Sequence, residues 1–174
     1  FEELPDGNLL HLKIVPNFLS PSWAAHVIKT DTAGHILWRT IIGENKPYNQ
    51  YNGVEMAVLP DDGVAVYWNE DIPIWSEDTV EKVDYLLKLD ANGDEVWRHY
   101  FVQHFDRQIN HIFTAKNGDI VGCGYFFYFE REGEPDSTLW ASWIFRMDGN
   151  GNLKWQRDIW DSRYADLQFL YAGA

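Results

Sequence analysis

The chain has 174 residues, enough to bury a core, and 45% of them are hydrophobic, which excludes a disordered chain. Its formal net charge of −13 disfavours nucleic acids and anionic membrane surfaces as partners, because both carry negative charge. Cys123 is the single cysteine, which excludes an internal disulfide, and it is expected to be a small buried residue on a strand. No apolar run reaches the length of a membrane span, so no membrane insertion is expected.

Aromatic residues make up 16% of the chain, and they favour half-buried pleated surfaces, so we expect β-strands throughout. Alternating hydrophobic residues between Gly-containing turns predict three groups of four strands in chain order. The first group covers 1–4, 8–14, 24–30 and 35–42. The second covers 54–59, 64–68, 83–89 and 94–101, and the third covers 109–115, 119–126, 140–147 and 152–159. In the third group, Gly122 and Gly124 are expected to allow close packing.

One motif, basic-x-Asp-x-x-Gly-x-x-x-Trp, recurs in each group. It reads KTDTAGHILW at 29–38, KLDANGDEVW at 88–97 and RMDGNGNLKW at 146–155. Its Asp and Gly suit a tight hairpin turn, in which the carboxylate accepts backbone N–H groups and the Gly adopts a positive φ. A second set of turns precedes the three copies, with PDG at 5–7, DDG at 61–63 and KNG at 116–118. Each repeat is therefore predicted to be a pair of hairpins.

Four-stranded antiparallel units at this period are typical of a β-propeller, so we predict an all-β propeller with about three blades visible. Residues 1–174 are interpreted as one propeller segment, completed by sequence outside it or by a partner chain, since closed propellers have about four to eight blades. The expected blades are approximately 1–45, 46–103 and 104–162. Residues 163–174 are expected to start a fourth blade, with an opening strand at 166–172.

The Asp-x-x-Gly-x-x-x-Trp element resembles the repeat of quinoprotein-like (PQQ-like) propellers, and it is also similar to propeller repeats in secreted or surface proteins of Bacteroidetes. The second resemblance is closer, because Ala33, Asn92 and Asn150 stand where the quinoprotein repeat has Thr before Gly. The resemblance implies that each Trp docks between neighbouring blades. The structural blade-docking residues that it implies are Asp31, Gly34, Trp38, Asp90, Gly93, Trp97, Asp148, Gly151 and Trp155.

The stretch from Asp90 to Asp94 superficially resembles the start of a calcium-binding loop. It lacks the bidentate Glu of such a loop, and the first copy offers only Asp31 before Thr-Ala-Gly. A plain hairpin turn is the favoured interpretation. No cofactor and no metal site are therefore expected, and calcium is the alternative.

The predicted topology puts the short turns at one end of the strands and the long connections at the other, where binding residues on rigid scaffolds usually lie. The candidate binding residues at this second end are Trp75, His104, Asp106, Arg107, Trp160 and Asp161. The alternative is a solvated, charged rim without a ligand. His104, Asp106 and His111 come nearest to a catalytic cluster, but a structural role is favoured, because the other repeats have no corresponding His. No catalytic residue is assigned.

The leading hypothesis for function is a noncatalytic module that binds protein or glycan or serves as a structural scaffold. It is expected to be extracellular, on the cell surface or periplasmic. Other propeller blades, from the same or another chain, are a further expected partner. The alternative is a fragment of a propeller enzyme of the quinoprotein dehydrogenase or sulfotransferase type.

Overall fold

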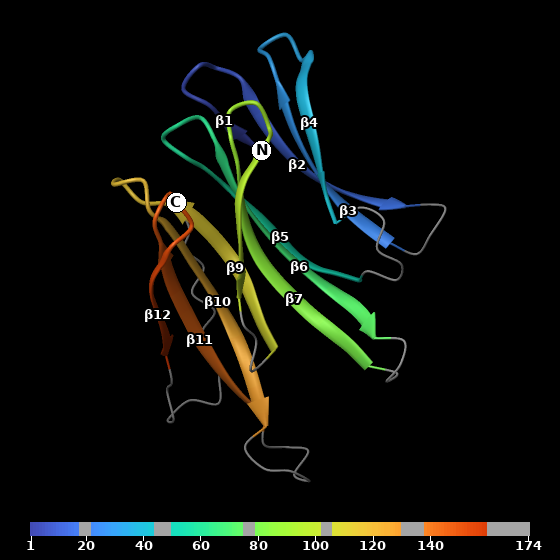
Figure 1. Cartoon of the computed structure of the whole chain (residues 1–174), viewed down its shortest axis with the longest axis vertical. Coiled ribbons are helices and arrows are strands. Elements are labelled where there is room, and N and C mark those ends of the chain that lie inside the picture. Colours follow the sequence, from blue (N-terminus) through green and yellow to red (C-terminus); the bar gives the residue numbers. More distant parts are fainter. Residues whose placement is uncertain (18–21, 44–49, 75–78, 102–105, 130–137, 160–174) are drawn as a thin grey trace.

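A computed structural model describes residues 1–17, 22–43, 50–74, 79–101, 106–129 and 138–159 (Figure 1). These residues form three antiparallel sheets of four strands each, and no helix occurs among them, so the all-β prediction is confirmed. Accordingly, this part of the chain holds no helix with the length and apolar character needed to cross a membrane.

Each sheet is built from four consecutive strands. The first sheet contains β1 (Glu2–Glu3), β2 (Leu9–Asn17), β3 (Ser22–Thr30) and β4 (Ile36–Ile42). The middle sheet contains β5 (Gln50–Val58), β6 (Val64–Ile74), β7 (Thr79–Leu89) and β8 (Glu95–Phe101). The third sheet contains β9 (Asp106–Thr114), β10 (Ile120–Phe129), β11 (Thr138–Met147) and β12 (Leu153–Ile159). The predicted opening strand at 166–172 lies outside the described residues.

Several strands extend further from the short turns than the sequence predicted. β6 was expected to end at Trp68 but continues to Ile74, and β7 begins at Thr79. The added segments, 69–74 and 79–82, mix charged residues with Ile and Val without regular alternation, yet Asp71 pairs in register with Lys82. Because the ladder is made by backbone groups, a hairpin can continue beyond the hydrophobic core that specifies its register.

The six short turns all lie at one end of the sheets, the upper end in Figure 1. In the turns between β3 and β4, β7 and β8, and β11 and β12, the glycines Gly34, Gly93 and Gly151 have φ of +85°, +86° and +85°. One strand residue before each of these turns, the register shifts by one. A glycine at positive φ beside a one-residue shift is the pattern of a G1 bulge, which the Gly of the motif makes possible.

Two hydrophobic clusters join the sheets face to face. The cluster between the first and middle sheets includes Leu10, Val27, Val66, Trp68 and Leu87. The cluster between the middle and third sheets includes Tyr67, Leu86, Ile120, Phe145 and Met147. Neighbouring residues of a strand alternate between the two clusters, as Val66 and Tyr67 do. The middle sheet is therefore covered on both faces, and the described sheets do not close into a ring.

Gly122 and Gly124 on β10 confirm the prediction of close packing. A Cβ on Gly122 would overlap the ring of Phe145, and a Cβ on Gly124 would overlap the carbonyl of Gln108. Cys123 lies between them on the opposite face of the strand and pairs in register with His111 of β9. It is half-buried, so the expectation of a small buried residue on a strand is confirmed for the strand and is met only in part for the burial.

Candidate functional site

Two tryptophan side chains join neighbouring sheets near the short turns. The Nε1–H of Trp38 on β4 donates to the carbonyl of Ala91, at 2.8 Å, in the turn between β7 and β8. The Nε1–H of Trp97 on β8 donates in the same way to the carbonyl of Gly149, at 3.1 Å, in the turn between β11 and β12. Both acceptors directly follow the Asp of the motif. Each Trp therefore binds the turn of the next sheet, and we call this pairing the Trp–turn contact.

The glycine of each contacted turn forms the surface on which the indole ring lies. A Cβ on Gly93 would be 2.7 Å from Cε3 of Trp38, and a Cβ on Gly151 would be 2.8 Å from Cδ2 of Trp97. A Cβ on Gly34 would have no atom of the described residues within 4 Å. Gly93 and Gly151 thus serve both the backbone conformation and the neighbouring ring, whereas the described surroundings of Gly34 require only the backbone conformation.

The aspartates of the motif are used to build the turns. Oδ1 of Asp90 accepts the N–H groups of Asn92 and Asp94, at 2.8 and 2.9 Å. Asp31 and Asp148 accept the corresponding pairs of N–H groups. The hydrogen bonds from Asp94 and Asn92 hold the pKa of Asp90 below its usual range. Among the described residues, no group of three or more His, Cys, Asp or Glu side chains is placed to hold a metal ion.

The basic residue that opens each motif forms an ion pair with an acid of the preceding hairpin turn. Lys29 Nζ lies 3.6 Å from Oδ2 of Asp6, and Lys88 pairs with Asp61. Arg146 Nε lies 2.6 Å from Oδ2 of Asp119. The two turns of a sheet are thereby tied together. The motif contains the basic residue but does not reveal its partner, because the acid stands at a different distance from the turn glycine in each copy.

Asp119 makes the densest of these ion pairs. Lys154 Nζ lies 2.7 Å from its Oδ1, and the amide of Asn117 donates to its Oδ2 at 2.9 Å. Together with Arg146, these donors leave the carboxylate of Asp119 6% exposed. Hydrogen bonding to Lys154 is the largest cause that lowers the pKa of Asp119 to about 2.

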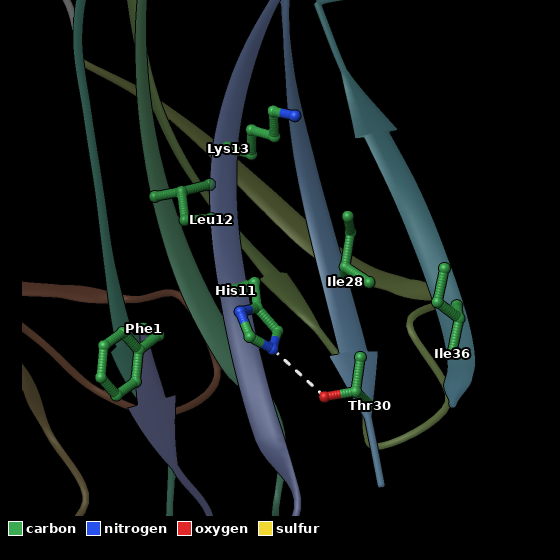
Figure 2. Close-up of a pocket in the computed structure, with 7 residues that line it drawn as sticks. All are labelled: Phe1, His11, Leu12, Lys13, Ile28, Thr30 and Ile36. Atoms are coloured by element: carbon green, nitrogen blue, oxygen red, sulfur yellow. Dashed lines mark hydrogen bonds between the residues drawn. The ribbon is translucent and has the colours of Figure 1, made fainter. Parts of the chain in front are cut away.

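A shallow hollow of about 420 Å³ lies on the first sheet (Figure 2). It is lined by Phe1, His11, Leu12, Lys13, Ile28, Thr30 and Ile36. Nε2 of His11 is 3.1 Å from Oγ1 of Thr30, and the rings of Phe1 and His11 are 6.5 Å apart. These residues were not predicted as a site, because they belong to no motif and alternate as the residues of any half-buried strand do.

His111 on β9 has a carboxylate partner from the middle sheet. Its Nδ1 lies 3.4 Å from Oε2 of Glu55 on β5. Burial raises the pKa of Glu55, and His111 offsets part of this effect. Burial and the nearby negative charge of Glu55 also raise the pKa of Cys123, which makes its thiol a weak nucleophile. This pair was not predicted, since the sequence suggested acids near His104 instead.

A polar network is buried between the middle and third sheets. The hydroxyl of Tyr67 donates to Oδ1 of Asp84, at 3.2 Å, and accepts the N–H of Ile109, at 3.3 Å. The amide of Asn69 donates to the same carboxylate oxygen. Burial, reinforced by Asp84, raises the pKa of Tyr67 well above its usual range. Because Ile109 lies beside a bulge in β9, this network fixes the position of an irregular strand on its neighbour.

Four of the six candidate binding residues lie outside the described residues. They are Trp75, His104, Trp160 and Asp161. Asp106 and Arg107 are the first two residues of β9, paired in register with Phe127 and Phe126, and their side chains are outside the described part of the chain. Their role in binding stays a prediction.

Comparison with known proteins finds no matching family model and no matching curated protein. Among solved structures, the chain is similar to a protein of unknown function from Bacteroides caccae, with 13% sequence identity and a TM-score of 0.42. The similarity covers 85% of this chain and 46% of that protein, so the chain spans about half the length of its structural neighbour.

Proposed function

We propose that this chain is a segment of a β-propeller that acts as a noncatalytic binding module, secreted, on the cell surface or in the periplasm. Its partner is a protein or a glycan, bound at the end of the strands opposite the short turns. The observation that carries the proposal is the Trp–turn contact. It occurs in the same form between the first and middle sheets and between the middle and third sheets, as in a scaffold extended by repetition.

The choice of the binding end follows from how the short turns are used. Their aspartates bond to their own backbone, their basic residues pair with acids in the adjacent turn, and two of their glycines receive a Trp ring. These groups support the scaffold. The long connections at the other end contribute Trp75, Trp160 and Asp161 to the sequence, and loops on a rigid scaffold are the usual place for recognition.

The composition of the chain narrows the ligand chemistry. A net charge of −13 attracts basic partners, and aromatic side chains supply flat faces on which sugar rings can stack. Binding to a basic protein segment should weaken as salt is added, because screening shortens the reach of the attraction. Binding to a neutral glycan should depend much less on salt.

A paired array of neutral glycans and basic peptides tests the proposal. We expect the chain to bind members of one class, and we expect the double substitution Trp75→Ala with Trp160→Ala to remove this binding. The matched control is Phe113→Ala, which removes an exposed aromatic residue of β9 that is 42% exposed and lies near the short turns. Failure to bind either class, or equal loss in the control and the double variant, would contradict the proposal.

A further inference from the structure

Among the described residues, the two outer sheets each have one partner of a Trp–turn contact without the other. In this part of the chain, the third sheet has a Trp without a turn, and the first sheet has a turn without a Trp. Trp155 on β12 lies opposite Arg146, just as Trp38 and Trp97 lie opposite Lys29 and Lys88. No turn of another sheet covers Trp155 within the described residues, and its side chain is 36% exposed. All residues of β12 are exposed. The third sheet therefore presents a Trp in the docking register without a described turn to receive it.

The first sheet presents the complementary half. Its turn at 31–34 has the same Asp-x-x-Gly sequence and the same positive φ at Gly34 as the turns that receive Trp38 and Trp97. The space beside Gly34 is open to 4 Å among the described residues. This turn is thus built like its two counterparts but holds no described indole ring.

The face of the first sheet that bears the hollow corresponds to the face of the middle sheet that is buried against the first sheet. Two cross-strand pairs of the first sheet, Leu9 with Thr30 and His11 with Ile28, occupy the same positions relative to the turns as two pairs of the middle sheet. The middle-sheet pairs are Val64 with Leu89 and Val66 with Leu87. The four residues of the middle sheet are 0% exposed, because the first sheet packs on them. In the first sheet, His11 and Ile28 instead line the hollow (Figure 2). The hollow therefore occupies the position where a preceding sheet would pack.

We propose that a second copy of this chain occupies both positions, with Trp155 of one copy docked on the 31–34 turn of the other. The inference rests on the proposed function, since it treats the sheets as propeller blades. The described residues of two copies would supply six sheets, within the range of about four to eight that closed propellers use. Because the two halves lie at opposite ends of the series, the docking would occur twice and close the assembly by a two-fold axis.

The atoms of the new contact follow from the two contacts already present in the chain. The Nε1–H of Trp155 would donate to the carbonyl of Thr32, which follows Asp31 as Ala91 follows Asp90. Its ring would lie on Gly34. The interface is thus a continuation of the Trp–turn contact, formed between chains instead of between sheets of one chain.

Sedimentation of the full chain over a concentration series tests this assembly. We expect a dimer with twice the mass of the 20.3 kDa chain. Trp155→Ala should weaken dimerisation about thirty-fold or more, the effect typical of removing an interface tryptophan from a packed site. Gly34→Ala should weaken it comparably, because the added methyl group would occupy the place of the partner's ring. Trp23→Ala, which removes another exposed Trp on the first sheet, should leave the dimer unchanged.

Mixing the two variants gives a sharper result than either variant alone. A dimer of the Trp155→Ala chain with the Gly34→Ala chain has one intact docking site, whereas each variant paired with itself has none. We therefore expect the mixture to dimerise more strongly than either variant. With both variants shown to be folded by circular dichroism, a mixture that associates no better than its components would overturn the docking scheme.

Other outcomes separate this inference from the proposed function. A chain that stays monomeric at every concentration would overturn the second copy as the occupant. If the indole N–H of Trp155 is nevertheless protected from exchange in that monomer, another part of the same chain covers it. Binding on the glycan and peptide arrays is measured independently, so a monomer that binds there would overturn the dimer and leave the proposed function standing.

Discussion

The ring of Trp38 fills the space where a side chain on Gly93 would lie, and its Nε1–H bonds to Ala91 two residues earlier. A single short turn therefore sets both the distance and the lateral position of the two sheets. The glycine of the motif therefore has two roles, to adopt the positive φ of the turn and to leave room for the Trp ring, and their contributions to stability can be measured separately.

Gly93→Ala should destabilise the fold more than Gly34→Ala. Both glycines have nearly the same positive φ, so both substitutions carry a backbone penalty of about 1–2 kcal/mol. At Gly93 the methyl group also meets the ring of Trp38, which adds an overpacking cost of about 1–3 kcal/mol. Urea unfolding of both variants at concentrations where the chain is monomeric measures the difference. Equal losses would show that the ring adapts at no cost.

Much of this arrangement was predictable from the spacing of the motif. The Asp and Gly residues marked the turns, because few other residues suit such tight turns. The positions of the turns then fixed which residues share a face of a strand. The acids that pair with Lys29, Lys88 and Arg146 were not predictable, because an ion pair tolerates a shift of its partner within a turn. Trp97 and Trp155 occupy the same position of the motif, and only the arrangement of the sheets shows that their surroundings differ.

The buried network and the pairing of His111 with Glu55 could not be found by pattern for a different reason. Tyr67, Asn69 and Asp84 come from two strands and meet only because β6 and β7 pair in one particular register. His111 and Glu55 come from different sheets. Such contacts depend on the packing of sheets, which a period-two pattern along one strand does not encode.

Tyr67→Phe should lower the free energy of unfolding by about 1–3 kcal/mol. The substitution removes the hydroxyl that accepts the N–H of Ile109 and donates to Asp84, in a place where water cannot replace it. Tyr100→Phe, at a position 56% exposed, should change stability by less than about 0.5 kcal/mol. Chemical denaturation of the two variants makes the comparison, and similar effects would mean that the network contributes little.

Asp119 should make stability depend on pH in the acid range. Its pKa is about 2 in the folded protein and near 3.8 when unperturbed, so the unfolded chain takes up the proton first as the pH falls. The stabilisation is fully present above about pH 4 and is lost as the pH falls through about 2. Unfolding titrations should show that Asp119→Asn lowers stability at neutral pH and that the difference from the unsubstituted chain narrows with acid.

The control for this pH dependence is Asp94→Asn, which changes an exposed carboxylate of a neighbouring sheet. As a surface substitution, it should change stability at neutral pH by less than about 0.5 kcal/mol. The free energies of unfolding of Asp119→Asn and of the unsubstituted chain should converge in acid. If their difference stayed constant from neutral to acid pH, the ion pairs with Lys154 and Arg146 would not be its cause.

Gly124→Ala should disturb the third sheet more than Gly149→Ala. A Cβ at position 124 would overlap the backbone of Gln108, which cannot rotate away, and the cost should be about 2–3 kcal/mol. A Cβ at position 149 would have its nearest neighbour at 3.7 Å, an ordinary contact distance. Thermal unfolding of the two variants tests this order, and a neutral Gly124→Ala would imply that β9 can shift.

The middle sheet contributes residues to both hydrophobic clusters, and this has a consequence for the order in which the chain opens. The first sheet packs on the middle sheet through one cluster and one Trp–turn contact, and the third sheet adds the hydrogen bonds of Tyr67 and Glu55, whereas β6 and β7 become exposed only after both neighbours have left. Native-state hydrogen exchange of the monomer should therefore be slowest at the amides of Val66, Tyr67 and Leu86, with protection decreasing toward both ends of the chain. Unfolding would then proceed inward from the two outer sheets, as fraying does in linear arrays of repeats.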